Sequence, residues 1–193
     1  MSGSAARPLV LTVVVCGASR SGKSMLLRGI HERLGAGRDN VGPPLDLNAM
    51  LDWVSLDLGN IGGRAATVLL YAVPGVMTFD ATRRVLVHGA DGVIFIADSQ
   101  AARIDDNLAA HGALAEHLAA RDGDPIPVAY FYSKQDLPAE LLVAPTVLDE
   151  VLGVGNAPRA VGDAVRGEGV REVLQAALTV ILRRASGNDA DDA

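Results

Sequence analysis

The sequence is poor in several residue types that indicate specialised functions. Of its 193 residues, one is cysteine and 4% are aromatic. The 17 basic residues are not clustered in the sequence, and the net charge is −6. A single thiol excludes an internal disulfide framework, and Cys16, at the end of an apolar run, is expected to be buried under reducing conditions rather than to act as a nucleophile. The acidic balance argues against bulk binding to nucleic acid.

Signals for membranes and targeting are also missing. No apolar run reaches the roughly 20 residues that a transmembrane helix needs, and the run at residues 9–16 lacks the cationic flank and cleavage site of a signal peptide. Position 2 is Ser2 and the last four residues are ADDA, which predicts neither N-myristoylation nor prenylation. We therefore expect a cytoplasmic protein without a direct membrane anchor.

The residues that are present suit one α/β domain with a sizeable core, since 49% of them are apolar. Short apolar runs predict strands at residues 9–16, 53–58, 67–72, 93–97 and 128–132. Helical patterns cover residues 25–34, 101–121, 146–152 and 170–184. Strands that alternate with helices predict a mostly parallel sheet with helices on both faces.

Glycine, proline and small polar residues mark the connections and ends. The cluster at residues 59–63 predicts a hairpin turn, and residues 35–44 are too rich in glycine and proline for regular structure. We expect a flexible N-terminus at 1–8, one domain at 9–185 and a disordered acidic tail at 186–193.

The most informative segment is GASRSGKS at residues 17–24, which fits the phosphate-binding pattern G-x-x-x-x-G-K-[ST]. It lies between a predicted strand and a predicted helix, where backbone N–H groups and the positive end of the helix dipole attract phosphate oxygens. Lys23, expected on a loop rather than in the core, would reach the β- and γ-phosphates, and the Ser24 hydroxyl would bind Mg²⁺. The residues expected to hold the phosphates are Gly17, Ser19, Ser21, Gly22, Lys23 and Ser24.

A second polar element, Ser133-Lys134-Gln135-Asp136, follows the strand at 128–132 directly. It resembles the [NT]-K-x-D motif that recognises guanine. The Asp136 carboxylate could accept hydrogen bonds from guanine N1 and the exocyclic amine together, which adenine does not offer, while the Lys134 stem could lie along the base. By itself, S-K-x-D also fits a solvated turn. Its position downstream of a phosphate loop, at a strand end, favours a base site.

Residues 71–76, YAVPGV, follow a further strand, and here the chain resembles the MglA-like bacterial Ras-type GTPases of the gliding-motility and cell-polarity group. The matching text is SLDLGNIGGRAATVLLYAVPG, FDATRRVLVHGADGVIFIADSQ and YSKQDLP, in family order, and the resemblance covers residues 9–184. It implies a Ras-like P-loop GTPase fold with a six-stranded sheet, GTP, GDP and Mg²⁺ as ligands, and a roadblock-domain (MglB-like) partner that stimulates hydrolysis, besides effectors.

The resemblance also implies roles for two further residues. Gly75 would donate its backbone N–H to the γ-phosphate, and the backbone N–H of Ala164 would lie near guanine O6. Around them the chain departs from the family. Val76 stands where the family has a water-orienting glutamine, Leu47 where it has an arginine and Asn48 where it has a threonine. Valine has no donor or acceptor with which to orient water.

These departures leave more than one function open. The leading hypothesis is a slow GTPase that switches between GTP and GDP. The alternative is a pseudo-GTPase that acts as an interaction scaffold without turnover. An ATP-dependent P-loop kinase is disfavoured by the S-K-x-D element. The four histidines share no ligand spacing, which makes a metal site built on them improbable.

Overall fold

The structure is a computed structural model that describes residues 7–34, 51–73 and 80–191. The expectations for Leu47, Asn48, Gly75 and Val76 lie outside the described residues. So do those for the loop at 35–44 and for residues 1–6 and 192–193 of the termini.

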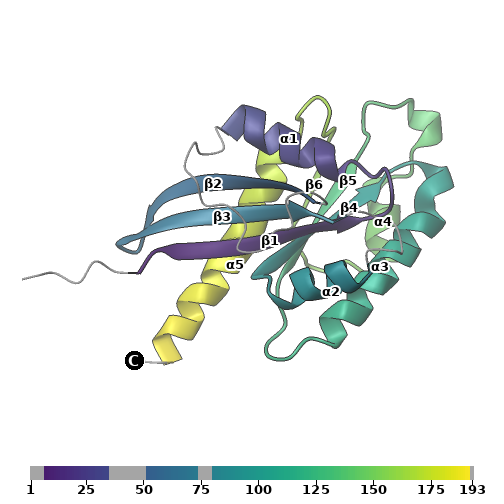
Figure 1. Cartoon of the computed structure of the whole chain (residues 1–193). Coiled ribbons are helices and arrows are strands. Elements are labelled where there is room, and N and C mark those ends of the chain that lie inside the picture. Colours follow the sequence, from purple (N-terminus) through teal and green to yellow (C-terminus); the bar gives the residue numbers. More distant parts are fainter. Residues whose placement is uncertain (1–6, 35–50, 74–79, 192–193) are drawn as a thin grey trace, which may run out of the picture.

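Among the described residues, six strands form a single sheet in the order β2-β3-β1-β4-β5-β6 (Figure 1). They are β1 (Leu9–Gly17), β2 (Asp52–Ile61), β3 (Arg64–Ala72), β4 (Gly92–Asp98), β5 (Val128–Ser133) and β6 (Arg159–Val161). Only β2 is antiparallel to its neighbour, since it forms a hairpin with β3. This mostly parallel sheet confirms the predicted α/β, Ras-like fold class.

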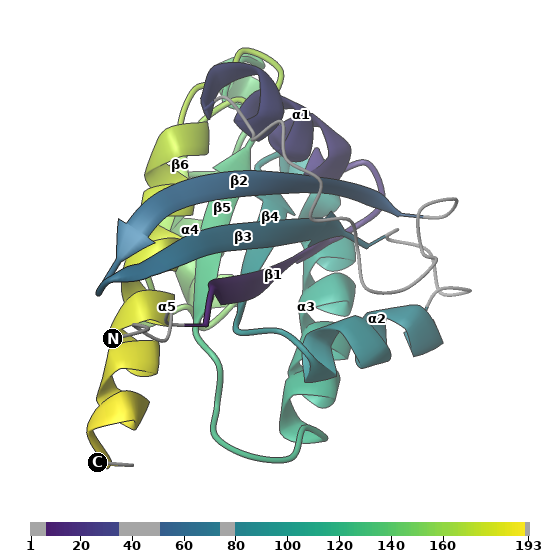
Figure 2. The ribbon, with the colours of Figure 1, turned by 60° about the vertical axis from the view of Figure 1, so that its left-hand side comes forward.

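Helices cover both faces of the sheet. They are α1 (Lys23–Leu34), α2 (Asp80–His88), α3 (Ile104–Ala119), α4 (Pro145–Val151) and α5 (Val170–Asp191). Helices α1 and α5 pack on one face, while α2 and α3 pack on the other (Figure 2). Within the described part of the chain, no helix is both long and apolar enough to cross a lipid bilayer.

Alternation along the central strands creates two hydrophobic cores. In β1, Val13 and Val15 face α1 and α5, whereas Val14 and Cys16 face the core beneath α2 and α3. Because successive side chains of a strand point to opposite faces, a continuous apolar run is what a strand buried on both faces requires. Cys16 is buried as predicted, and burial raises the pKa of its thiol to about 12.

The structure differs from the sequence prediction in several elements. Strand β6 spans only Arg159–Val161, too short to leave a pattern. The helix predicted to start at 101 begins with a 3-10 turn, η2 (Ala101–Arg103), before α3. Helix α5 continues to Asp191, so residues 186–191 are helical where we expected disorder. Extending an existing helix by one residue costs much less than starting one.

The hairpin turn lies slightly later than predicted, because β2 runs to Ile61 and the chain reverses at Gly62 and Gly63. Both glycines have a positive φ, 59° and 82°, which a side chain would disfavour. The Asn60 side-chain oxygen accepts a hydrogen bond from the Gly63 N–H at 2.9 Å.

The sheet register brings the strand ends that matter to one edge. Gly17 of β1 pairs with Ile96 of β4, and Asp98 of β4 pairs with Ser133 of β5. The loops that follow these three parallel strands therefore emerge side by side, where ligands of open α/β sheets bind.

Candidate nucleotide-binding site

The loop after β1 is a tight turn in which several residues have a positive φ. Gly17, Arg20 and Gly22 have φ values of 147°, 63° and 108°, outside the range that most side chains adopt. A Cβ on Gly17 would lie 2.3 Å from the Ile96 carbonyl oxygen, which only glycine avoids. Successive backbone N–H groups in a glycine-rich turn can form a concave arrangement that binds anions.

Lys23 is the first residue of α1 and its side chain is 8% exposed, so it is buried, contrary to the expectation of an open loop position. Its Nζ donates to the carbonyls of Gly17, at 3.1 Å, and Ala18, at 2.6 Å. Burial lowers the pKa of this ammonium to about 8. A pocket of about 220 Å³ lies here, lined by Arg20, Gly22, Lys23, Ser24 and Met25.

Ser133, at the end of β5, contacts the phosphate loop directly. Its hydroxyl is buried and lies 2.8 Å from the Ser21 carbonyl and 3.1 Å from the Ala97 carbonyl. The first residue of the S-K-x-D element therefore ties two loops together. Asp136, in contrast, is exposed and forms no hydrogen bond or ion pair within the described part of the chain.

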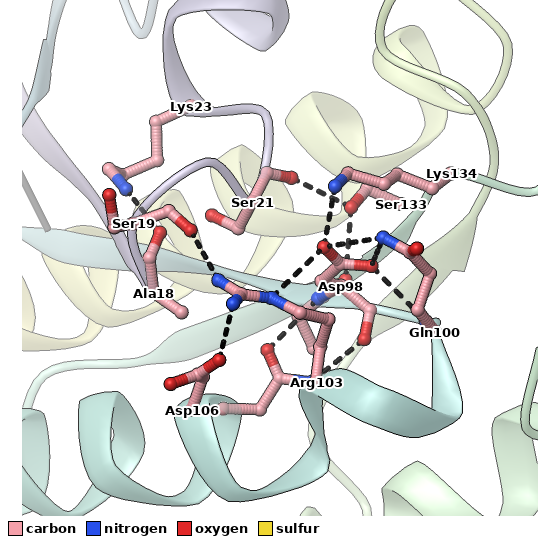
Figure 3. A network of polar contacts seen from close by, with 12 residues as sticks. Ala18, Ser19, Ser21, Lys23, Asp98, Gln100, Arg103, Asp106, Ser133 and Lys134 are labelled. Carbon is pink, nitrogen blue, oxygen red and sulfur yellow. Dashed lines mark hydrogen bonds and ion pairs between the residues drawn. The ribbon is translucent and has the colours of Figure 1, made fainter.

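A buried carboxylate that the sequence analysis did not select lies beneath both loops. Asp98 is fully buried at the end of β4. The Lys134 Nζ lies 2.6 Å from its Oδ2, and the Gln100 side-chain amide lies 3.0 and 3.2 Å from its two oxygens (Figure 3). An aspartate directly after an apolar strand was the available signal, because a charge there needs cationic partners.

Arg103 of η2 completes this cluster. Its Nη2 donates to the Ser19 carbonyl at 2.7 Å, and its Nε lies 3.7 Å from Asp98 Oδ2. Its Nη1 forms an ion pair of 2.5 Å with Asp106, which is exposed on the first turn of α3. Figure 3 shows the guanidinium between the phosphate loop and α3.

The loop between β6 and α5 lies against the phosphate loop as well. The Asp163 carboxylate accepts hydrogen bonds from the N–H groups of Val165, at 2.8 Å, and Arg166, at 3.2 Å, which fixes the turn. A Cβ built on Gly22 would lie 3.8 Å from the Ala164 Cβ. The Gln135 N–H donates to the Gly162 carbonyl at 3.2 Å.

The fold thus brings most of the sequence-predicted residues to one edge of the sheet. The phosphate loop contacts Ser133 through Ser21 and lies beside Ala164 at Gly22. Lys134, whose φ is 66°, turns its ammonium to Asp98 beneath the phosphate loop. Sequence reasoning missed Asp98, Gln100 and Arg103, which join these loops.

Comparison with known proteins identifies the family. No family model matches the chain. It is 31% identical over 182 residues to the mutual gliding-motility protein MglA of Myxococcus xanthus, an alignment that covers 91% of this chain and 92% of that protein. The similarity spans nearly the whole of both chains and agrees with the Ras-like fold and with the convergence of the three loops. The chain belongs to the MglA family of small GTPases.

Proposed function

We propose that this protein is a molecular switch that binds GTP and GDP with Mg²⁺ and hydrolyses GTP slowly. The observation that carries the proposal is the contact between the Ser133 hydroxyl and the Ser21 carbonyl. It places the S-K-x-D element beside the phosphate loop, as a ligand with both a purine base and a phosphate chain requires.

Each loop has donors or acceptors that suit one part of the nucleotide. The loop at 17–24 offers backbone N–H groups and the Lys23 ammonium to phosphate oxygens, and the exposed Ser24 suits a Mg²⁺ ligand. Mg²⁺, when bound, neutralises charge on the phosphates. The exposed Asp136 carboxylate is free to accept from guanine, and Ala164 could present its N–H to the same base. By family resemblance, Gly75 would contact the γ-phosphate.

Slow hydrolysis is inferred from the residues at two family positions. Val76 cannot orient water, and Leu47 cannot stabilise phosphoryl charge. Loss of a water-orienting group or an arginine each costs orders of magnitude in rate. The same two residues, together with Ser133, which is shorter than the asparagine of the family, support the alternative, a pseudo-GTPase scaffold without turnover.

A cytoplasmic role with a roadblock-domain partner is proposed from the family. The contact would use the hairpin turn at 59–64 and helix α2 near Arg83 and Arg84. On α2, Arg84 is exposed and Val85 is 62% exposed, which suits a surface that binds a partner. Binding of an MglB-like dimer, measured in the presence of GDP and of a GTP analogue, tests this proposal. No binding in either state would contradict it.

The nucleotide proposal is tested by extracting the purified protein and identifying the released nucleotide by chromatography, followed by titration with GTP and ATP in Mg²⁺. We expect guanine nucleotide and a clear preference for GTP. Equal affinity for the two triphosphates would reject guanine recognition, and no affinity for either would reject nucleotide binding.

The hydrolysis proposal is tested by single-turnover assays of the unmodified protein and of Val76→Gln. We expect slow hydrolysis in the first and an increase of about tenfold or more in the second, because glutamine can orient the attacking water. Rapid hydrolysis by the unmodified protein would show that another residue positions the water. No hydrolysis by either, with GTP bound, would favour the scaffold.

A further inference from the structure

Two carbonyl groups of the phosphate loop are held by side chains from other parts of the chain. Arg103 Nη2 lies 2.7 Å from the Ser19 oxygen, and the Ser133 hydroxyl lies 2.8 Å from the Ser21 oxygen. Ser19 and Ser21 alternate with Arg20 and Gly22, both of which have a positive φ. The carbonyls that are held therefore precede the residues whose backbone conformation is unusual.

Peptide geometry gives these contacts a consequence for the N–H groups. In a trans peptide the C=O and the following N–H point in opposite directions, and the structure contains no cis peptide bond among the residues that it describes. Because the Ser19 carbonyl points to Arg103, the N–H of Arg20 points away from Arg103. By the same reasoning, the Ser133 contact turns the N–H of Gly22 away from β5.

Arg20 needs such support more than its neighbours. Its φ of 63° lies in the left-handed region, where a side chain crowds the following carbonyl. A residue of this kind keeps its conformation when the surrounding structure fixes it. The Arg103 hydrogen bond fixes the peptide on the N-terminal side of Arg20.

Arg103 itself is held firmly enough to do this. Its planar guanidinium spans Ser19, Asp98 and Asp106, and five N–H donors allow three partners at once. Its side chain is 29% exposed, and Asp98 keeps Lys134 and Gln100 as partners without it. Removal of Arg103 is therefore compatible with an intact core.

We propose that Arg103 is a positioning residue that orients the Ser19–Arg20 peptide, so that the Arg20 N–H faces the phosphate chain of the ligand. The proposal rests on the proposed function for the identity of that ligand. It predicts that Arg103 contributes to phosphate binding and leaves base recognition unchanged.

The test compares Arg103→Ala with Arg103→Lys and with the control Arg184→Ala. Arg184 is a matched control because it is also 29% exposed and also donates to a carbonyl, that of Asp124, away from the site. GDP and guanosine affinities are measured by titration, with thermal unfolding as the check on the fold. The amide resonance of Arg20 is recorded by NMR without nucleotide.

We expect Arg103→Ala to weaken GDP by about tenfold or more, because an oriented donor to a charged group is lost. Guanosine affinity should stay unchanged, Arg103→Lys should recover part of the loss, and Arg184→Ala should match the parent. The Arg20 amide resonance should shift in Arg103→Ala and not in Arg184→Ala.

Several results would overturn the proposal. Equal loss of GDP and guanosine affinity would mean that Arg103 acts through Asp98 and Lys134 on residues 133–136, the loop proposed to bind the base (the base loop). An unchanged Arg20 resonance would mean that Arg103 does not orient the peptide. If the parent binds no guanine nucleotide, the proposed function fails, but the NMR comparison still decides whether Arg103 positions this loop.

Discussion

The phosphate loop and the base loop lie side by side, but the side chains that we propose to contact the ligand are held to different degrees. The phosphate loop is braced by Arg103 at Ser19, by Ser133 at Ser21 and by its own Lys23. In the base loop, the carboxylate that we propose to accept hydrogen bonds from guanine, that of Asp136, is exposed. If these loops bind the nucleotide as proposed, its phosphate chain meets groups that the fold already holds in place, whereas selectivity for guanine depends on one side chain at the surface.

This difference has a physical reason. A phosphate chain carries several charges, and N–H groups bind it well only when they are oriented before the ligand arrives. Guanine is neutral and offers its N1 and amine hydrogens to one carboxylate. Substitutions in the phosphate loop should thus change affinity for all nucleotides, whereas substitutions at Asp136 should change which base is preferred.

The largest effect is expected at Lys23. Lys23→Ala removes the ammonium that would contact two phosphates, so triphosphate affinity should fall roughly a hundredfold or more, for GTP and ATP alike. Calorimetric titration with each nucleotide measures this loss. GTP affinity equal to that of the parent would show that residues 17–24 do not bind phosphate.

Lys23→Met is the matched variant for stability. Lys23 is buried and donates to the Gly17 and Ala18 carbonyls, so either substitution should lower the free energy of unfolding by about 1–3 kcal/mol. The methionine keeps most of the side-chain volume and separates loss of packing from loss of charge. If both variants bind GTP with similarly reduced affinity, the loss of affinity is due to the missing ammonium rather than to lost packing.

The second largest effect is expected at Asp136 in the base loop, where a substitution should change which base is preferred. Asp136→Asn should weaken GTP by about tenfold to a hundredfold, since two hydrogen bonds to a carboxylate are lost. Xanthosine triphosphate should gain affinity, because the amide can donate to the oxygen that replaces the guanine amine. Competition assays with GTP, ATP and xanthosine triphosphate measure the order. An unchanged order of nucleotide affinities would mean that Asp136 does not contact the base. Because Asp136 is exposed, we expect the free energy of unfolding to stay unchanged.

How far the sequence predicts this molecule depends on the range of each interaction. The apolar runs predict β1 and β4 because burial on both faces needs consecutive apolar residues. Gly17 to Ser24 were predicted because the phosphate loop is contiguous. Arg103 was missed because it lies 84 residues from Ser19, and no local pattern marks a contact that only the sheet register creates. The three residues of β6 were missed because so short a strand has no periodicity.

A smaller effect is expected at Ser133, where the two loops meet. Ser133→Ala removes the hydrogen bond to the Ser21 carbonyl and should weaken nucleotide binding about twofold to tenfold. Since the hydroxyl contacts the phosphate loop, GTP and ATP should weaken in the same proportion. Parallel titrations of both nucleotides give the ratio, and Ser133→Thr, which keeps the hydroxyl, is the control. A selective loss of GTP would assign Ser133 to base recognition instead.

The smallest expected effect is a proton taken up on binding. Burial lowers the pKa of Lys23 to about 8, so near pH 8 about half of the unliganded molecules carry a neutral amine. A bound phosphate chain favours the charged form and raises that pKa. Binding of GDP should therefore take up about half a proton at pH 8 and almost none at pH 6, and affinity should fall as pH rises from 7 to 9.

Calorimetry in two buffers with different ionisation enthalpies measures this uptake directly. Lys23→Met provides the control at high GDP concentration, because it has no group to protonate at this position. Equal proton uptake in parent and variant would assign the proton to another group. No uptake by the parent at pH 8 would mean that the Lys23 ammonium is already fully charged before the nucleotide binds. The phosphate loop would then have both its charge and its backbone conformation in place before the ligand binds. The difference between the phosphate loop and the base loop in how far each is preorganised would then be larger than we infer.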